Sequence, residues 1–238
     1  MELRILGMNG PFPAPGGAAS GYYFREGDTR LILDLGSGTL SRLTLETVPE
    51  DMDALLISHW HADHTSDLQV LGYRLQALGK TMPLYGPGDK VSFTSQAADR
   101  DSAFTVTRVA PGDRFRVGEL SVEVFGARHP VPSVMYRITG REGIFCYTGD
   151  TNLFPGLSDF ARGADWLLAD AAFDDRTWGE GKPHLSGRLC GQIAREAGVK
   201  KLILTHLNPL VDHDAVLREA REAFPDCLLA RQGMRIGG

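Results

Sequence analysis

The chain is poor in cysteine and has no apolar run long enough to cross a membrane. It has three cysteines among 238 residues, an odd number, and two of them lie in apolar or helical stretches. We therefore expect reduced thiols rather than a disulfide framework. No apolar stretch approaches the roughly 18 residues that a membrane span requires, so no membrane partner is expected. The first residues have an acid at Glu2 and a broken apolar run, which does not read as a signal peptide, and the expected location is the cytoplasm.

Positive charge is not in excess either. The chain carries 25 basic and 30 acidic residues, a formal net charge of −5. That balance is a poor electrostatic footprint for a dedicated nucleic-acid-binding protein, although a local basic patch is compatible with it. The length and the 42% hydrophobic content instead predict one large or two small domains, with a core that needs no disulfide or metal staple.

Short apolar runs rich in β-branched residues alternate with helical patterns along most of the chain. The helical patterns cover residues 65–78, 186–197 and 214–223, and Gly198 stands where a helix C-cap is expected. Strands are predicted at residues 3–6, 22–24, 31–35, 54–57, 115–124 (a hairpin turned at Gly118), 134–138, 144–147, 166–169, 202–204 and 227–230. This order indicates an α/β or α+β domain with helices on the faces of its sheet.

Five of the predicted strands run into a histidine or an aspartate. The residues at these strand ends are His59, His129, Asp150, Asp170 and His206. Active sites of sheet proteins gather where strand ends open onto loops. We therefore expect these five side chains to converge on one site.

The densest group of candidate ligands is the segment 58–65, Ser-His-Trp-His-Ala-Asp-His-Thr. His59 and His61 alternate along an extended segment, so both can face one side. Asp63 and His64 enter a turn and can face a second centre. Imidazole and carboxylate suit zinc, manganese or iron, and the absence of a nearby cysteine argues against a structural zinc site. The alternative reading is a solvated loop that happens to be rich in histidine.

Three single residues supply what this segment lacks. Alone, His129 reads as a surface histidine, Asp150 as a turn or N-cap residue, and His206 as a hydrogen-bonded core histidine. Together they add a third nitrogen ligand, a carboxylate able to bridge two metals, and a histidine for a second centre. Two metals about 3.5–4 Å apart can hold a bridging hydroxide and clamp both the attacking and the leaving oxygen of a displacement.

The pattern His-x-His-x-Asp-His, followed in order by single His, Asp and His residues, resembles the metallo-β-lactamase superfamily. The resemblance extends from Gly7 to about Ala230 and implies a four-layer αββα sandwich of the α/β (α+β) class, with residues 1–238 as a single domain. It implies two divalent metal ions, zinc foremost and manganese or iron as alternatives. Metal one would be held by His59, His61, His129 and Asp150, and metal two by Asp63, His64, Asp150 and His206.

Two positions separate the branches of that superfamily. The third position of the motif is His61 rather than Glu, which disfavours the di-iron oxygen-reducing branch. The bridging position is Asp150 rather than Cys, which disfavours true β-lactamases.

The segment 183–188, Pro-His-Leu-Ser-Gly-Arg, is similar to ribonuclease Z-like phosphodiesterases. The resemblance implies that His184, paired with an acid after the preceding strand, protonates the leaving oxygen, which is ordinary general-acid chemistry. The usual acid in that group is Glu, whereas this chain has Asp170, one methylene shorter. The alternatives are a helix-start role for His184 and an N-cap role for Asp170.

A glycine-rich loop at residues 10–21, together with residues 33–38, resembles a branch of small bacterial ribonuclease Z-like proteins. Some members of that branch are reported as cyclic-nucleotide phosphodiesterases. The loop could offer backbone N–H groups to a phosphate or shape the pocket rim, or it could be a simple turn-rich connection.

Two features of ribonuclease Z proper are missing from the sequence. No long inserted arm interrupts the chain between His129 and His206, and the stretch between His129 and Asp150 has only Arg137 and Arg141 in place of a basic loop. With the net charge of −5, this places tRNA behind small cyclic phosphodiesters as the expected substrate.

The resulting expectation is a dinuclear metal-dependent phosphodiesterase that opens a cyclic nucleotide such as cAMP through a metal-bridging hydroxide. Asp63 orients the nucleophile, and His184, held by Asp170, protonates the leaving group. The alternatives are a ribonuclease Z-type tRNA 3′-processing endonuclease, a cyclic ribose-phosphate phosphodiesterase, a thioester or lactone hydrolase, and a metal-binding sensor without turnover. The resemblance also implies a homodimer, and His213 is left as a surface residue.

Overall fold

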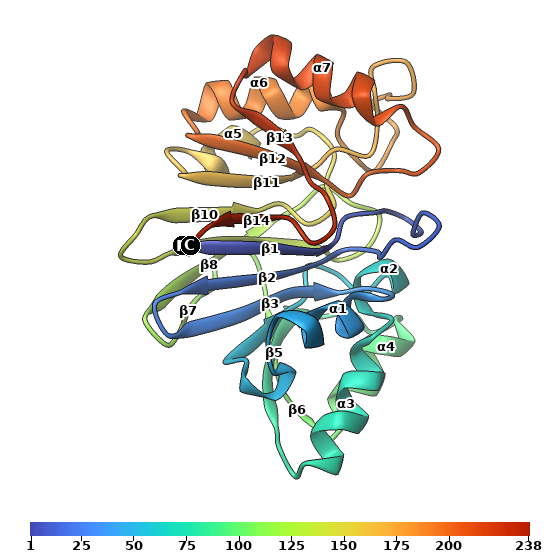
Figure 1. The fold of residues 1–238 in the computed structure, drawn as a ribbon, viewed down its shortest axis with the longest axis vertical. Helices are drawn as coiled ribbons and strands as arrows, with labels where there is room; N and C mark the ends of the chain where they lie inside the picture. Colours follow the sequence, from blue (N-terminus) through green and yellow to red (C-terminus); the bar gives the residue numbers. More distant parts are fainter.

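Two seven-stranded mixed sheets pack face to face in the computed structural model, which describes residues 1–238 (Figure 1). The first sheet has the order β14-β1-β2-β3-β4-β5-β6. Its strands are β1 (Glu2–Gly7), β2 (Gly21–Glu26), β3 (Thr29–Leu35), β4 (Ala54–Leu56), β5 (Met82–Pro87), β6 (Phe104–Val109) and β14 (Arg235–Gly237).

The second sheet has the order β13-β12-β11-β10-β9-β8-β7. Its strands are β7 (Arg114–Val117), β8 (Leu120–Gly126), β9 (Val134–Thr139), β10 (Ile144–Tyr147), β11 (Trp166–Asp170), β12 (Lys201–Thr205) and β13 (Cys227–Leu229). The strand predictions for this half of the chain agree with these bounds to within a residue or two.

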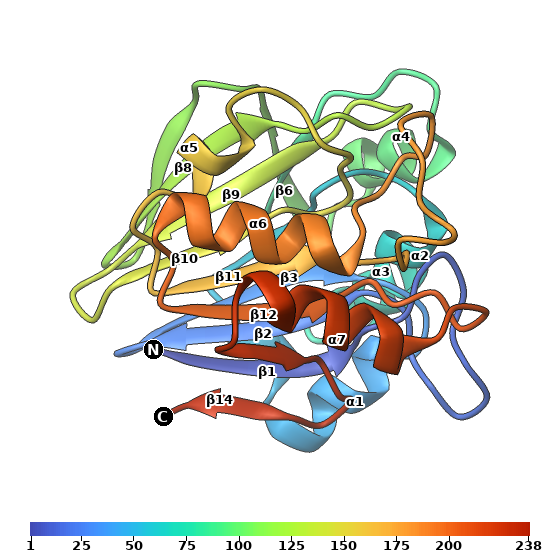
Figure 2. The ribbon, with the colours of Figure 1, turned by 90° about the horizontal axis from the view of Figure 1, so that it is seen from above.

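Helices cover the outer face of each sheet, which completes the four-layer αββα arrangement (Figures 1 and 2). The first sheet carries α1 (Thr39–Glu46), the 3₁₀ turn η1 (Pro49–Asp51), α2 (Ala62–Thr65), α3 (Leu68–Ala77) and α4 (Phe93–Arg100). The second carries α5 (Leu157–Ala161), α6 (Gly187–Ala197) and α7 (His213–Ala223), and Figure 2 shows α6 and α7 side by side over it. No helix is long and apolar enough to cross a membrane.

The apolar residues form three layers of core. Alternation along β3 sends Leu31 and Leu33 into the core between the sheets, and Ile32 into the core beneath α1 and α3. A third cluster lies between the second sheet and α5, α6 and α7. All three cysteines are buried and free, as expected from the sequence.

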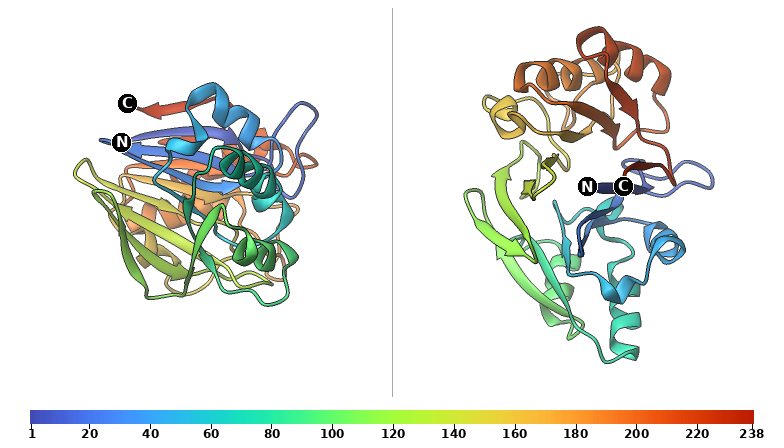
Figure 3. Two further views of the ribbon diagram at one scale, coloured as in Figure 1. Left: turned by 90° about the horizontal axis from the view of Figure 1, so that it is seen from below. Right: turned by 60° about the vertical axis from the view of Figure 1, so that its left-hand side comes forward.

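The helix expected over residues 65–78 is present as α3, but it begins only at Leu68, and Thr65 belongs to the preceding short helix α2. The break falls at Asp67, whose backbone N–H donates to Leu35 O and whose side chain accepts from Leu40 N. These bonds hold the segment between the two helices against β3 and α1. As a result, α2 and α3 do not form one continuous helix. No predicted element corresponds to β5, β6, β14, α1, α4 or α5. Strand β14 pairs with β1, so the two termini lie together (Figure 3).

The strand directions bring the predicted strand ends to one edge of the second sheet. β10, β11 and β12 are parallel, and β8 shares their direction because β9 runs antiparallel to both β8 and β10. The loops that carry the candidate ligands after these strands therefore open at the same edge, opposite the loop that follows β4.

Candidate metal centre

The first sheet supplies four side chains within six residues. His59 and His61 lie in the extended segment after β4, and Asp63 and His64 lie in the single turn of α2. His59 Nε2 is 3.0 Å from His61 Nδ1. The turn into α2 then sends Asp63 and His64 to a different part of the cluster, as the spacing predicts.

The second sheet supplies the remaining candidates from the ends of β8, β10 and β12. His129 Nε2 lies 3.2 Å from His61 Nδ1, although 68 residues separate them in the chain. His206 has a positive φ of 53°, a conformation that turns its ring back over the sheet edge and is uncommon for a residue other than glycine. The packing of the two sheets therefore brings together residues that are remote in sequence.

The side chains form two groups that share one carboxylate. In each group the nearest ligand atoms all lie within 4.8 Å of one another. Asp150 belongs to both, with Oδ2 3.5 Å from His59 Nε2 and Oδ1 3.2 Å from His64 Nε2. The first group contains His59, His61, His129 and Asp150, and the second contains Asp63, His64, Asp150 and His206.

The donor atoms fit divalent cations. His64 Nε2 and Asp150 Oδ1 are buried, face each other, and have no hydrogen-bond partner. Buried polar atoms are normally satisfied, and imidazole nitrogen with carboxylate oxygen is the donor set that zinc, manganese and iron accept. A cation at each group would satisfy these atoms.

The electrostatics of the metal-free side chains point the same way. Burial, with the nearby charge of His64, lowers the pKa of His59 well below its usual value. Burial also opposes charge on His64, but the carboxylates of Asp150 and Asp34 outweigh it and raise the pKa of His64 well above normal. For His206 burial is likewise outweighed, chiefly by Asp150, and its pKa rises to about 10. The buried carboxylates therefore demand compensating positive charge, which protons or metal ions can provide.

Asp170 and His184 meet beside these two groups. Asp170, the last residue of β11, reaches His184 with its shorter side chain: Oδ2 is 2.8 Å from Nδ1. Asp170 is fully buried, and its carboxylate also accepts from Thr151 N. The bond between Asp170 Oδ2 and His184 Nδ1 leaves Nε2 as the free ring nitrogen of His184. Asp150, Asp170, His184 and His206 also satisfy the spacing of a ligand group.

Three buried residues of the site were not identified as such from the sequence. Asp34 contacts the ring of His64, and Ser58 contacts the ring of His59. Asn152, in the loop that follows β10, donates a hydrogen bond to the loop before His184. A signal for Asp34 was present, because it is a charged residue inside an otherwise apolar strand. His213, by contrast, starts α7 and contacts Asn208 O outside the cluster.

The glycine-rich loop lies against the second group. Gly10 N donates to Leu207 O, and a Cβ built on Gly10 would lie 1.9 Å from His206 Nε2. Only glycine therefore fits at this contact.

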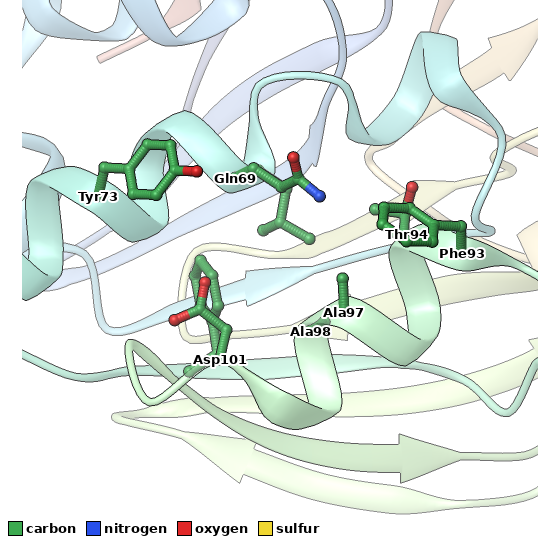
Figure 4. Close-up of a pocket in the computed structure, with 9 residues that line it drawn as sticks. Gln69, Tyr73, Phe93, Thr94, Ala97, Ala98 and Asp101 are labelled. Carbon is green, nitrogen blue, oxygen red and sulfur yellow. The ribbon is translucent and has the colours of Figure 1, made fainter.

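Three cavities differ in their relation to the cluster. Two border His129: one of about 280 Å³, lined by Arg128, Pro130, Glu180, Lys182 and their neighbours, and one of about 660 Å³, lined by Pro87, Ala127, Val134 and their neighbours. The third, of about 340 Å³, lies between α3 and α4 with Tyr73 and Phe93 at its rim, and none of the predicted site residues lines it (Figure 4). The two cavities beside His129 are therefore the ones placed to receive a molecule reacting at the cluster.

The chain is similar in sequence to known proteins. Residues 29–207 match the family described as "Beta-lactamase superfamily domain". The chain is 31% identical to the probable metallo-hydrolase YhfI of Bacillus subtilis, with 94% of each chain covered. It is 29% identical to a ribonuclease Z of Methanopyrus kandleri, with 99% of this chain and 97% of that protein covered.

Solved structures agree with these sequence matches. The crystal structure of Bacillus subtilis YhfI superposes with a TM-score of 0.94 at 30% identity, covering 100% of this chain and 98% of that one. Human tRNase Z, short form, superposes with a TM-score of 0.81 at 20% identity, covering 100% and 99%. The second likeness concerns the fold.

Proposed function

We propose that this chain, which belongs to the beta-lactamase superfamily and is a metal-dependent hydrolase, cleaves a phosphodiester bond in a cyclic nucleotide. The observation that carries the proposal is the Asp170–His184 pair beside two His/Asp ligand groups. A proton donor next to such groups suits a substrate with a poor leaving group such as a sugar alkoxide. Hydrolysis of a thioester has less need of one, because a thiolate leaves readily.

The two ligand groups would hold two divalent ions, with zinc first and manganese or iron as alternatives. Bound there, the ions would lower the pKa of a water and neutralise charge on the phosphoryl oxygens. His59, His61 and His129 with Asp150 would hold one ion. Asp63, His64 and His206 with Asp150 would hold the other.

The chain's own residues would manage the protons. Asp63 is partly accessible and its Oδ2 is 3.1 Å from His206 Nε2, so it would orient the attacking water. The attacking water would release one proton to solvent. As its oxygen bonds to phosphorus and the phosphorus–sugar oxygen bond breaks, His184 Nε2 would give a proton to the leaving oxygen. Asp170 would stabilise the protonated ring, and His184 would regain its proton from solvent.

The preference for a small substrate rests on charge. The cavity of about 280 Å³ beside His129 has only two cations in its lining, Arg128 and Lys182, together with the acid Glu180. Arg137, one of the two arginines between His129 and Asp150, is bound to the carbonyls of Phe160 and Arg162, and Arg141 pairs with Glu119. These arginines therefore do not form a basic surface for a long RNA.

Ribonuclease Z-type cleavage of a tRNA precursor is the second candidate. The observation in its favour is the relative of that name, which is 29% identical over nearly the whole chain. A homodimer could supply a basic surface that one chain lacks. We place the protein in the cytoplasm in either case.

A substrate panel separates these candidates. Purified protein loaded with zinc or manganese would be assayed against 3′,5′- and 2′,3′-cyclic nucleotides, bis-p-nitrophenyl phosphate and a tRNA precursor. We expect cyclic-nucleotide opening that is lost on chelation and kept in His213→Ala, whose histidine lies outside the cluster. Activity on the tRNA precursor alone would replace the cyclic-nucleotide proposal with the second candidate, and no phosphodiester turnover would reject both.

A further inference from the structure

Asp34 is a buried carboxylate that belongs to neither ligand group. It lies near the end of β3, has no solvent exposure, and adopts a positive φ of 53°. Burying a charge and holding an aspartate in this conformation both cost free energy. Such a residue persists where the surrounding contacts compensate for that cost.

Three side chains and one backbone amide donate to this carboxylate. His64 Nδ1, Ser58 Oγ and Tyr147 OH reach Asp34 Oδ2 at 2.7, 2.7 and 2.5 Å. The backbone N–H of Ser58 reaches Oδ1 at 2.7 Å. The donors come from the loop after β4, from α2 and from β10, so Asp34 joins both sheets beneath the metal centre.

One of these contacts extends to a second histidine. Ser58 Oγ lies 3.1 Å from His59 Nδ1. The hydroxyl proton of Ser58 goes to Asp34, so Ser58 Oγ is free to accept from His59 Nδ1–H. Both histidines then turn Nε2 toward Asp150, His59 in the first ligand group and His64 in the second.

We propose that Asp34 is a positioning residue that sets the ring orientation and tautomer of one histidine in each metal subsite, holding His64 directly and His59 through Ser58. A metal-ligating histidine needs its second ring nitrogen held by an acceptor, which fixes the tautomer and increases the basicity of the coordinating nitrogen. Here a single carboxylate serves both subsites. The inference rests on the proposed two-metal centre, but it does not depend on the substrate.

Tyr147 provides the matched control. It donates to the same oxygen of Asp34 and is fully buried, yet it contacts neither His59 nor His64 by a hydrogen bond. Tyr147→Phe therefore removes one bond from Asp34 and leaves both histidine contacts in place. Ser58→Ala removes the link to His59 alone. Asp34→Asn removes the negative charge and replaces one of the two acceptor oxygens with an NH2 donor.

The experiment measures metal affinity, site occupancy and ring protonation rather than turnover. Zinc dissociation constants would be obtained by chelator competition for the wild type, Ser58→Ala, Tyr147→Phe and Asp34→Asn. Anomalous diffraction would give the occupancy of each subsite, and NMR of the zinc-loaded protein would give the imidazole Nδ1–H resonances. Thermal unfolding of each variant would report its fold separately.

We expect Asp34→Asn to weaken both zinc ions by about 10–100-fold, the usual cost of removing such a partner. Ser58→Ala should weaken only the ion at His59 and shift only the His59 Nδ1–H signal. Tyr147→Phe should lower thermal stability and leave both zinc affinities within about twofold of wild type. If Tyr147→Phe lowered zinc affinity as much as Asp34→Asn, Asp34 would only support the fold. The same conclusion would follow if Ser58→Ala lowered zinc affinity equally at both subsites.

The outcome is independent of the proposed function. Two tightly bound zinc ions with no phosphodiester turnover would reject the proposed phosphodiesterase and leave the role of Asp34 intact. If Asp34→Asn does not fold, the Ser58→Ala and Tyr147→Phe pair still decides the question. A wild-type chain that binds no zinc would overturn the inference together with the metal centre.

Discussion

Asp150 is the residue on which the candidate centre converges. Its carboxylate lies 3.5 Å or less from ring nitrogens of His59, His64 and His206, which come from two different sheets. Burial would favour its neutral form, but these rings, His206 first, hold the pKa of Asp150 well below its usual value. A carboxylate that stays ionised in a buried site can bridge two cations, whereas a protonated one could not.

His184 is the residue that distinguishes the proposed chemistry. In His184→Gln we expect turnover of a cyclic nucleotide to fall by about 10²–10⁴-fold, because no group remains to protonate the alkoxide. Turnover of bis-p-nitrophenyl phosphate should fall far less, because nitrophenolate leaves without a proton. Steady-state kinetics on both substrates checks this, and equal losses on the two would remove His184 from the proton donor's role.

The backbone of Gly10 packs directly against the ring of His206. A methyl group at Gly10 would overlap the ring of His206, so Gly10→Ala should displace that ring and weaken one zinc ion by at least about tenfold. Chelator competition measures the effect. Gly181→Ala is the control, because a Cβ there meets no atom within 4 Å. Unchanged zinc affinity in Gly10→Ala would mean that the loop gives way instead.

At the scale of elements, the loop between β11 and α6 carries His184 and depends on Asn152. The Asn152 side chain donates to the carbonyls of Glu180 and Lys182, and its oxygen accepts from Trp178 Nε1. Asn152 itself is tied to Arg128 O through its backbone. Asp150, next but one to Asn152 in the chain, and His184 are therefore held together through this one residue.

Asn152→Ala should loosen this loop. Two carbonyls, both of exposed residues, lose their donor, and a typical hydrogen bond contributes about 0.5–1.5 kcal/mol to stability. We expect cyclic-nucleotide turnover to drop with zinc content unchanged, and nitrophenyl ester turnover to be less affected. Arg176→Ala, in the same loop but exposed and paired only with Asp174, is the control. Loss of zinc in Asn152→Ala would instead show that Asn152 helps to position the metal ligands.

Helices α6 and α7 pack through two glycines of α6. A Cβ on Gly187 would lie 2.1 Å from Val216 O, and one on Gly191 would lie 2.4 Å from Ala220 O. Such contacts with backbone cannot be relieved by a side-chain rotation, so the absence of side chains sets how closely the two helices approach. Ser186 caps α6 by accepting from Leu189 N, and α6 begins at Gly187, three residues after His184.

Gly191→Ala should therefore destabilise the protein by about 1–3 kcal/mol, the usual cost of overpacking. Urea or thermal unfolding measures it. Gly88→Ala serves as the control, because Gly88 has open space around it and a φ that other residues adopt. A Gly191→Ala variant as stable as wild type would mean that the two helices can move apart freely.

At the scale of the whole molecule, the candidate centre sits where the two sheets meet, and the carboxylates of Asp63, Asp150 and Asp170 are gathered there. Ligands that bind only the folded state add stability by mass action, about 4 kcal/mol at 1,000 times the dissociation constant. Chelation should therefore lower the unfolding midpoint, and zinc should restore it. His213→Ala should show the same shifts as the wild type in calorimetry. An unfolding midpoint that changes with neither chelator nor zinc would contradict the metal centre.

The sequence by itself determined the family, the αββα fold and the identity of most site residues. The reason is local: the motif at residues 59–64 is contiguous, and apolar and period-two runs mark the strands that lead to His129, Asp150, Asp170 and His206. Buried strands such as β4 and β10 are short apolar runs that read directly from the chain.

Only the tertiary structure decided how those residues meet. Whether Asp170 could reach His184, how far the ligand atoms lie from one another, and the shared contacts of Asp34 all depend on strand register and on the approach of two sheets. The elements that the sequence left out, such as α4 and β14, are short and acquire their stability from packing or from pairing at a sheet edge. Contacts between residues more than 60 positions apart have no local pattern, because the geometry that creates them exists only after the sheets have packed.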